Sequence, residues 1–129
     1  MVGQPAALAM SEVEGVELTG ELPAGVLSTD LALEITHRLR KLGAAGSFLE
    51  FFGPGGAALT AGDRAVVANM APEYGASTGF FPADSAVPAY LCQIGRGEAL
   101  TVAIEPTFLA MGLWFGADAR PRFNRSLTV

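Results

Sequence analysis

The helix pattern between residues 28 and 42 constrains the fold more than any other feature of this sequence. Acidic side chains stand early in the segment and basic ones late, as the helix dipole favours. Ser28, Thr29 and Asp30 are candidates for the N-cap, and Gly43 suits the position after the last turn. Apolar positions three or four residues apart share one face of this helix. They are Leu31, Ile35, Leu39 and Leu42.

Short apolar segments flank the helix on both sides. Residues 13–22 place Val16 and Leu18 on one parity with polar side chains between them, which predicts a half-buried strand. Residues 47–52 (SFLEFF) are rich in aromatic side chains and lie between glycines, which predicts a strand buried on both faces apart from Glu50. Strands that alternate with helices indicate an α/β layer arrangement.

The next part of the chain predicts a loop over residues 53–59 and a second helix over residues 61–70. Thr60 and Asp63 have the spacing of a capping box, with Asp in place of Glu, at the start of this helix. Pro72 disfavours helical geometry at the residue before it, so the helix should end or kink at Ala71.

The rest of the pattern is weaker. Residues 79–81 predict a third strand, which Pro82 stops, and Ser85 is a candidate cap for a short helix after it. Residues 98–115 are apolar but broken by proline and glycine, so they predict a helix only weakly, and the tail from Gly116 is expected to be irregular. Three strands would make a thin sheet.

Composition leaves two readings of this fold open. With 129 residues, 50% of them hydrophobic and only 16% charged, the chain is apolar for a small domain. Either it forms a tightly packed α/β unit by itself, or it is a piece of something larger whose other parts bury the excess apolar surface.

Charge and cysteine content exclude several classes of function. A net charge of −5 argues against a nucleic-acid surface, and no window approaches the length of a membrane span. The basic residues at 120–125 are expected in a solvated tail. The single cysteine, Cys92, excludes a disulfide within the chain and fits the cytoplasm, and it is expected to be buried. The single histidine, His37, is expected on the surface, so no hydrolase triad can be argued.

The candidate functional residues are Asn69 and Glu73, in the segment NMAPEYGA (69–76). Glu73 is expected just past a helix C-terminus, where the dipole disfavours an anion. It is either a solvated loop residue or a carboxylate held for hydrogen bonding or proton transfer. Asn69, one turn earlier, either caps the late carbonyls of the helix or faces a ligand.

Several segments resemble the aconitase family, in the long single-chain form shared by bacterial aconitase A and the iron regulatory proteins. Their order and spacing are those of the family, and the NMAPEYGA segment is the most specific of them. Beyond residue 96 the resemblance thins to GLW (112–114). The matching segments are VGQP (2–5), residues 15–59, residues 62–84 and YLCQIGR (90–96).

The resemblance implies a three-layer α/β/α fold and a lyase that interconverts citrate and isocitrate through cis-aconitate. In the family a [4Fe-4S] cluster held by three cysteines binds the substrate hydroxyl and carboxylate. Carried over by position, Asn69 would lie near the cluster, and Glu73 would hydrogen-bond the substrate hydroxyl or iron-bound water.

The chain departs from the family in what it lacks. The cluster cysteines, the substrate-binding arginines and the serine base match no residue here, so the chain alone is expected to bind no cluster and to be inactive. We expect an incomplete α/β unit over residues 1–96, followed by a weakly matching helical segment and tail over 97–129. Its partners would be the missing aconitase segments or a self-associating apolar face, and tricarboxylate would bind only to a complete enzyme. The alternative is a non-catalytic binding or interaction module.

Overall fold

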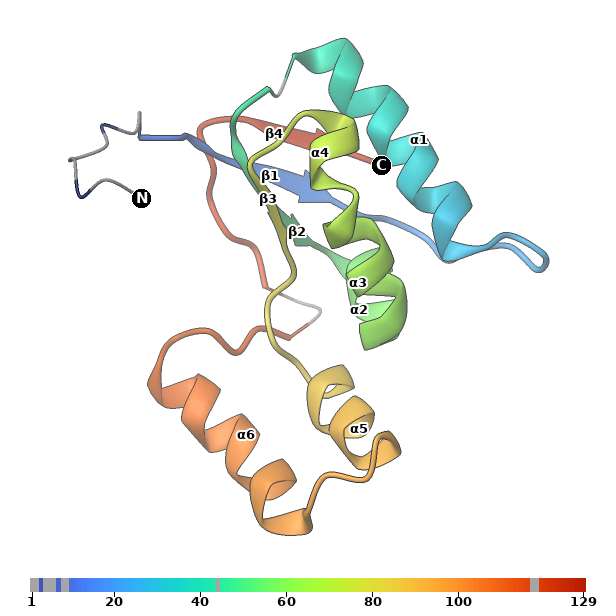
Figure 1. The fold of residues 1–129 in the computed structure, drawn as a ribbon. Helices are drawn as coiled ribbons and strands as arrows, with labels where there is room; N and C mark the ends of the chain where they lie inside the picture. The colour runs from blue at the N-terminus through green and yellow to red at the C-terminus, as the bar shows by residue number, and fades with distance from the viewer. Residues whose placement is uncertain (1–2, 4–6, 8–9, 44, 117–118) are drawn as a thin grey trace.

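Four parallel strands form the centre of the fold in the computed structural model, which describes residues 3, 7, 10–43, 45–116 and 119–129. Their order across the sheet is β3-β2-β1-β4 (Figure 1). The α/β class and the short sheet predicted from the sequence are confirmed. The strands are β1 (Val13–Glu17), β2 (Phe48–Phe52), β3 (Thr78–Phe80) and β4 (Ser126–Thr128).

The helices are divided between one face of the sheet and a separate hairpin. Helices α1, α3 and α4 pack on one another beside the sheet, whereas α5 and α6 form a pair that extends away from it (Figure 1). Among the described residues, no helix is long and apolar enough to cross a membrane. The helices are α1 (Ser28–Leu42), α2 (Pro54–Ala58), α3 (Ala61–Asn69), α4 (Ala71–Tyr74), α5 (Ala86–Gln93) and α6 (Glu98–Ala110).

Helix α1 has the predicted bounds but a different cap. The N-cap residue is Leu27, and its backbone N–H donates to the Asp30 carboxylate at 2.9 Å, so Asp30 acts from inside the first turn. Gly43 ends the helix in the left-handed conformation, with φ of 71°. The buried face is formed by Ala32, Ile35 and Leu39, whereas Leu42 is largely exposed.

The two faces of the sheet are covered unequally. Val16, Leu49 and Phe51 point toward the helices and are buried. Because side chains alternate along a strand, Phe48 and Phe52 point to the opposite face, where Phe48 is 42% exposed. The prediction that β2 is buried on both faces was therefore wrong for its second face.

The segment predicted as a loop after β2 contains the short helix α2. Gly53 precedes it with φ of 94°, a conformation that favours glycine. A Cβ on Gly55 would lie 2.8 Å from the backbone carbon of Leu18, so a glycine lets α2 approach the end of β1. Helix α2 therefore depends on glycines that allow this backbone conformation and this close approach, rather than on residues that favour helix formation.

Helix α3 begins with the predicted capping box. Thr60 Oγ1 accepts a hydrogen bond from the Asp63 N–H at 3.2 Å, and the Asp63 carboxylate accepts one from the Thr60 N–H at 3.2 Å. The Thr60 hydroxyl also donates to that carboxylate at 2.6 Å and is the main cause of the lowered pKa of Asp63.

Replacing Thr60 with alanine should lower the free energy of unfolding by about 1 kcal/mol, because it leaves the first N–H groups of α3 without their cap. Urea denaturation followed by circular dichroism measures this change. Thr107→Ala is the matched control, since the Thr107 hydroxyl donates to the carbonyl of Ala103 within α6 and caps no helix start. Equal effects of the two substitutions would contradict the capping role.

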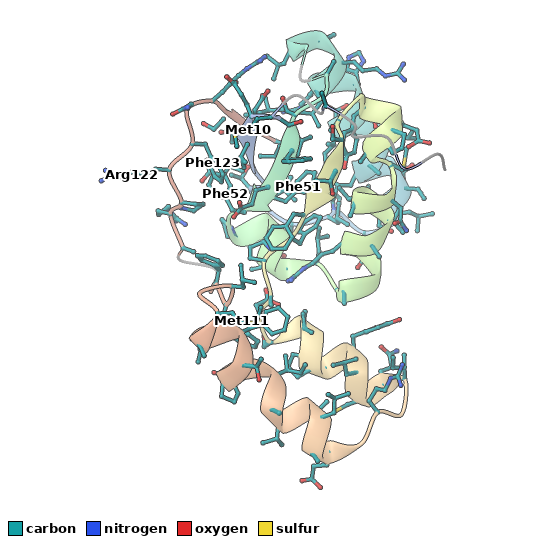
Figure 2. All side chains as sticks on the ribbon, turned by 60° about the vertical axis from the view of Figure 1, so that its left-hand side comes forward. Met10, Phe51, Phe52, Met111, Arg122 and Phe123 are labelled. Carbon is teal, nitrogen blue, oxygen red and sulfur yellow. The ribbon has the colours of Figure 1, made fainter. Side chains whose placement is uncertain are left out.

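The sequence predicted an irregular C-terminal tail. The end of this tail instead returns to the sheet as β4. Ser126, Leu127 and Thr128 pair in parallel with Gly15, Val16 and Glu17. The basic segment before it is anchored, since the Arg125 guanidinium donates to the carbonyl of Leu42 and lies 3.5 Å from the Glu14 carboxylate. The ring of Phe123 packs on the sheet beside Phe52, with centroids 5.5 Å apart (Figure 2).

Two further predictions about the C-terminal half were wrong. Ser85 occupies the N-cap position of α5 but makes no capping hydrogen bond, and the Asp84 carboxylate accepts from the N–H of Ala86 instead. Cys92 was predicted to be buried, but it is exposed on α5.

The prediction that His37 lies on the surface is confirmed, since its side chain is exposed on α1. The VGQP segment falls largely outside the described residues, and the division of the chain at residue 97 stays a prediction.

Candidate functional site

Glu73 is presented outward by its two buried neighbours in the one-turn helix α4. Ala71 and Tyr74 lie in the core, where Tyr74 is 1% exposed, so Pro72 and Glu73 between them face solvent. Gly75 then ends the turn with φ of 85°. Glu73 therefore lies just past the end of α3, as predicted, but inside a one-turn helix that the sequence did not predict.

Tyr74 is the anchor that holds this turn. Its hydroxyl donates to the carbonyl of Val67 at 3.1 Å, and its ring meets the edge of Phe51 at 6.5 Å between centroids. Burial, with a smaller contribution from the charge of Glu73, raises the pKa of Tyr74 to about 12. Gly79 leaves room for this hydroxyl, because a Cβ at that position would collide with it.

Hydrogen bonds to backbone carbonyls fix the turn to its surroundings. The Arg40 guanidinium of α1 donates to the carbonyl of Glu73 at 2.6 Å. The N–H of Gly46 donates to the carbonyl of Gly75 at 2.8 Å, and the N–H of Ser77 to the carbonyl of Ser47 at 2.9 Å. The backbone around Glu73 is thus held from both α1 and the start of β2, while its carboxylate stays accessible.

Asn69 is the last residue of α3 and is also exposed. Pro72 separates the two helices as predicted, with Met70 at the junction. Within the described part of the chain, no hydrogen bond joins the side chains of Asn69 and Glu73, and the amide of Asn69 caps no helix carbonyl. Both polar groups therefore remain free to meet a ligand or another polypeptide segment.

These two residues lie at the amino ends of the strands, away from a cavity at the opposite edge of the sheet. Asn69 and Glu73 precede β3, whereas a cavity of about 520 Å³ opens at the carboxyl ends, where Leu18 follows β1 and Val129 follows β4. Open parallel sheets usually bind ligands at their carboxyl ends. Fold geometry alone would thus direct attention to the opposite edge of the sheet.

Sequence reasoning missed a nearly buried ion pair between α3 and the start of α5. The Arg64 guanidinium donates to both oxygens of Asp84, at 2.9 and 2.7 Å, and also to the carbonyls of Leu59 and Ala57. Only 8% of the Arg64 side chain and 16% of the Asp84 side chain are exposed. The signal in the sequence would have been Arg64 itself, a charged residue on the buried face of a helix. A buried charge requires a partner of opposite charge.

The donor set does not fit an iron–sulfur cluster. Such a cluster takes three or four cysteine thiolates, and the chain has one cysteine, exposed on α5. No group of three or more His, Cys, Asp or Glu side chains among the described residues is placed to hold a metal ion. Glu73 and Asn69 can supply hydrogen bonds and a carboxylate to a site, but thiolate ligands would have to come from elsewhere.

Comparison with known proteins identifies the family. The profile of the Aconitase family (aconitate hydratase) matches residues 1–129. The chain is 48% identical over 126 residues to aconitate hydratase A of Thermus thermophilus, covering 98% of this chain, and 48% identical over 125 residues to that of Bacillus subtilis, covering 96%. It is 42% identical over 129 residues to aconitate hydratase A of Escherichia coli, covering 100%.

The match covers a small part of each relative. The chain spans 14% of the length of these three aconitate hydratases, although nearly every residue of the chain is included. A match along the whole chain at this identity establishes common descent and a common local fold. The chain belongs to the aconitase family.

Proposed function

We propose that this chain is a segment of an aconitate hydratase, which interconverts citrate and isocitrate through cis-aconitate in the cytoplasm. The observation that carries the proposal is the family match over all 129 residues, combined with a turn that directs Glu73 outward. A single cysteine, in a chain that spans 14% of its relatives, supports a role that depends on other segments.

In this role Glu73 supplies a carboxylate to the substrate, and Asn69 an amide beside it. The rigid turn between Met70 and Ser77 sets where the carboxylate stands, and an accessible carboxylate can accept a hydrogen bond from a substrate hydroxyl or exchange a proton with it. Thiolates outside these residues would hold the [4Fe-4S] cluster of a complete enzyme, and the chain alone would not turn over aconitate.

A chimera tests the proposal. The matching segment of the Thermus thermophilus aconitate hydratase A is replaced by this chain, and aconitate turnover is measured after iron–sulfur reconstitution. Turnover by the chimera, and none by the chain alone, is the expected result. Turnover by the chain alone would overturn the proposal, as would a folded chimera with a bound cluster and no activity.

Within this chimera, Glu73→Gln should lower turnover about 100-fold, the lower end of the range for loss of an acid–base group. The measurement is the steady-state rate with citrate or isocitrate. Glu34→Gln is the matched control, because Glu34 is an exposed carboxylate on α1 whose ion-pair partner among the described residues is Arg38. Its turnover should stay within twofold of the unsubstituted chimera, and an equal loss for both variants would contradict a site role for Glu73.

The second candidate function is a non-catalytic interaction module. The observation that favours it is the number of large apolar side chains exposed on the α5–α6 hairpin. An inactive chimera that nevertheless folds and holds its cluster would favour this function. The exposed residues are Tyr90, Ile94, Leu100, Val102, Leu109 and Met111.

A further inference from the structure

We propose that Arg40 is a positioning residue for Glu73. Its guanidinium, on the last turn of α1, sets the direction in which α4 presents the Glu73 carboxylate. This inference rests on the proposed function, because it takes Glu73 as the carboxylate that meets the substrate. Arg40 acts through the backbone of Glu73 and not by contact with the substrate.

The carbonyl of Glu73 needs a donor from outside its own helix, because the last carbonyls of a helix have no partner within it. The N–H of Ala76 donates to the carbonyl of Ala71 at 3.0 Å, as expected for a helix that ends at a left-handed glycine. Among the described residues, no backbone N–H donates to the carbonyl of Glu73. The Arg40 Nε–H donates to it instead, at 2.6 Å. Because this donor is charged, the hydrogen bond is stronger than one between neutral groups.

This hydrogen bond matters because α4, with 4 residues, is too short to hold its own shape. Isolated helices shorter than about 12 residues are marginal in water. The N–H of Glu73 donates to the carbonyl of Met70 at 3.0 Å, so the bond from Arg40 completes the fixing of both backbone groups of Glu73. The Glu73 carboxylate has no hydrogen-bond partner among the described residues. The backbone alone therefore sets where the carboxylate stands.

Helix α1 is a rigid support for this donor. Leu39, the residue before Arg40, is 1% exposed, and Ile35 on the same buried face is 0% exposed. The backbone that carries Arg40 is therefore fixed in the core, although the Arg40 side chain itself is exposed. The planar guanidinium of arginine is pre-organised for such a bond, whereas the lysine ammonium is a point charge on a flexible stem.

Substitutions in the chimera test the effect on catalysis. Arg40→Met keeps the stem of the side chain but removes the donor, and it should lower turnover about tenfold, because a small displacement of a reacting group is costly. Arg40→Lys keeps a charged donor and should restore turnover to within about threefold of the unsubstituted chimera. Arg38→Met is the matched control, since Arg38 lies on the same helix but pairs with Glu34. Its turnover should stay unchanged.

A double variant of the chimera shows whether Arg40 acts through Glu73. Because Glu73→Gln already removes the carboxylate, adding Arg40→Met to it should lower turnover by less than about a further twofold. Additive losses would show that Arg40 acts by another route and would overturn the inference. Full turnover by Arg40→Met, beside a large loss for Glu73→Gln, would also overturn it and leave the proposed function intact. No loss for Glu73→Gln would overturn both.

Hydrogen exchange of the chain alone gives a readout that needs no activity. Arg40→Met should speed amide exchange in the peptide that spans residues 70–77 by at least about threefold, because the turn loses one of its attachments. Exchange in β2 should stay the same, and Arg38→Met should change neither segment. An unchanged exchange rate in the turn of the Arg40→Met variant would overturn the inference. An equal acceleration in β2 would overturn it too, since Arg40 would then support the whole fold and not this turn.

Discussion

Replacing Asp84 with alanine should lower the free energy of unfolding by about 3–4 kcal/mol, a large part of the stability of a small domain. The substitution leaves the charge of Arg64 almost buried, with only the carbonyls of Leu59 and Ala57 as acceptors. It also removes the cap that Asp84 provides for the N–H of Ala86 at the start of α5. Urea denaturation followed by circular dichroism measures the loss.

The exposed ion pair on α1 is the control for this prediction. Glu34→Ala removes the partner of Arg38, yet both side chains are half exposed, so the free energy of unfolding should change by less than about 0.5 kcal/mol. The double variant Arg64→Met/Asp84→Ala should be more stable than Asp84→Ala, because it no longer buries an unpaired charge. Additive losses in the double variant would contradict this explanation.

Local signals predicted the elements that depend on local chemistry. Helix α1 and helix α3 both have the predicted extent, because an apolar face, a glycine after the last turn and a capping box act within a few residues. The cap of α1 was misassigned by a few residues, since Asp30 bonds the N–H of Leu27 from inside the helix. Signals of this kind predict the presence of a helix more accurately than they predict its first residue.

Long-range pairing could not be predicted in the same way. Strand β4 contains only Ser126, Leu127 and Thr128, and its partner β1 lies more than a hundred residues earlier in the chain. Nothing in three such residues distinguishes a strand from a tail. The anchoring of Arg125 to Glu14 and Leu42 depends on the same return of the chain, so the sequence predicted the exposure of this basic segment but not its attachment to the sheet.

The candidate site shows the same division between local and long-range information. The order of apolar and polar residues in APEYGA explains why Glu73 is exposed, since the apolar residues Ala71 and Tyr74 are buried on either side of it. Its assignment to an active site came from the resemblance to aconitases. Neither periodicity nor the binding rule for open sheets leads to the amino ends of the strands.

Replacing Phe51 with alanine should lower the free energy of unfolding by about 3–5 kcal/mol, because the site is fully buried and has little freedom to collapse. The ring stacks on Phe81 at 4.5 Å between centroids and meets Tyr74 edge to face (the label in Figure 2 marks its position within the sheet). Urea denaturation of the variant and of the unsubstituted chain, followed by circular dichroism, measures the difference in the free energy of unfolding. Phe51→Leu, which keeps most of the volume, should cost about 1.5 kcal/mol and keeps the test valid if the alanine variant does not fold.

A residue on the opposite face of the sheet provides the matched control. Phe52, the next residue along β2, is half-buried and points the other way, against Phe123, so Phe52→Leu should cost less than Phe51→Leu in the isolated chain. Equal costs in the isolated chain would contradict the unequal cover of the two faces. Phe51 links the sheet to Tyr74, so its loss should also free the turn that carries Glu73 and lower the turnover of the chimera.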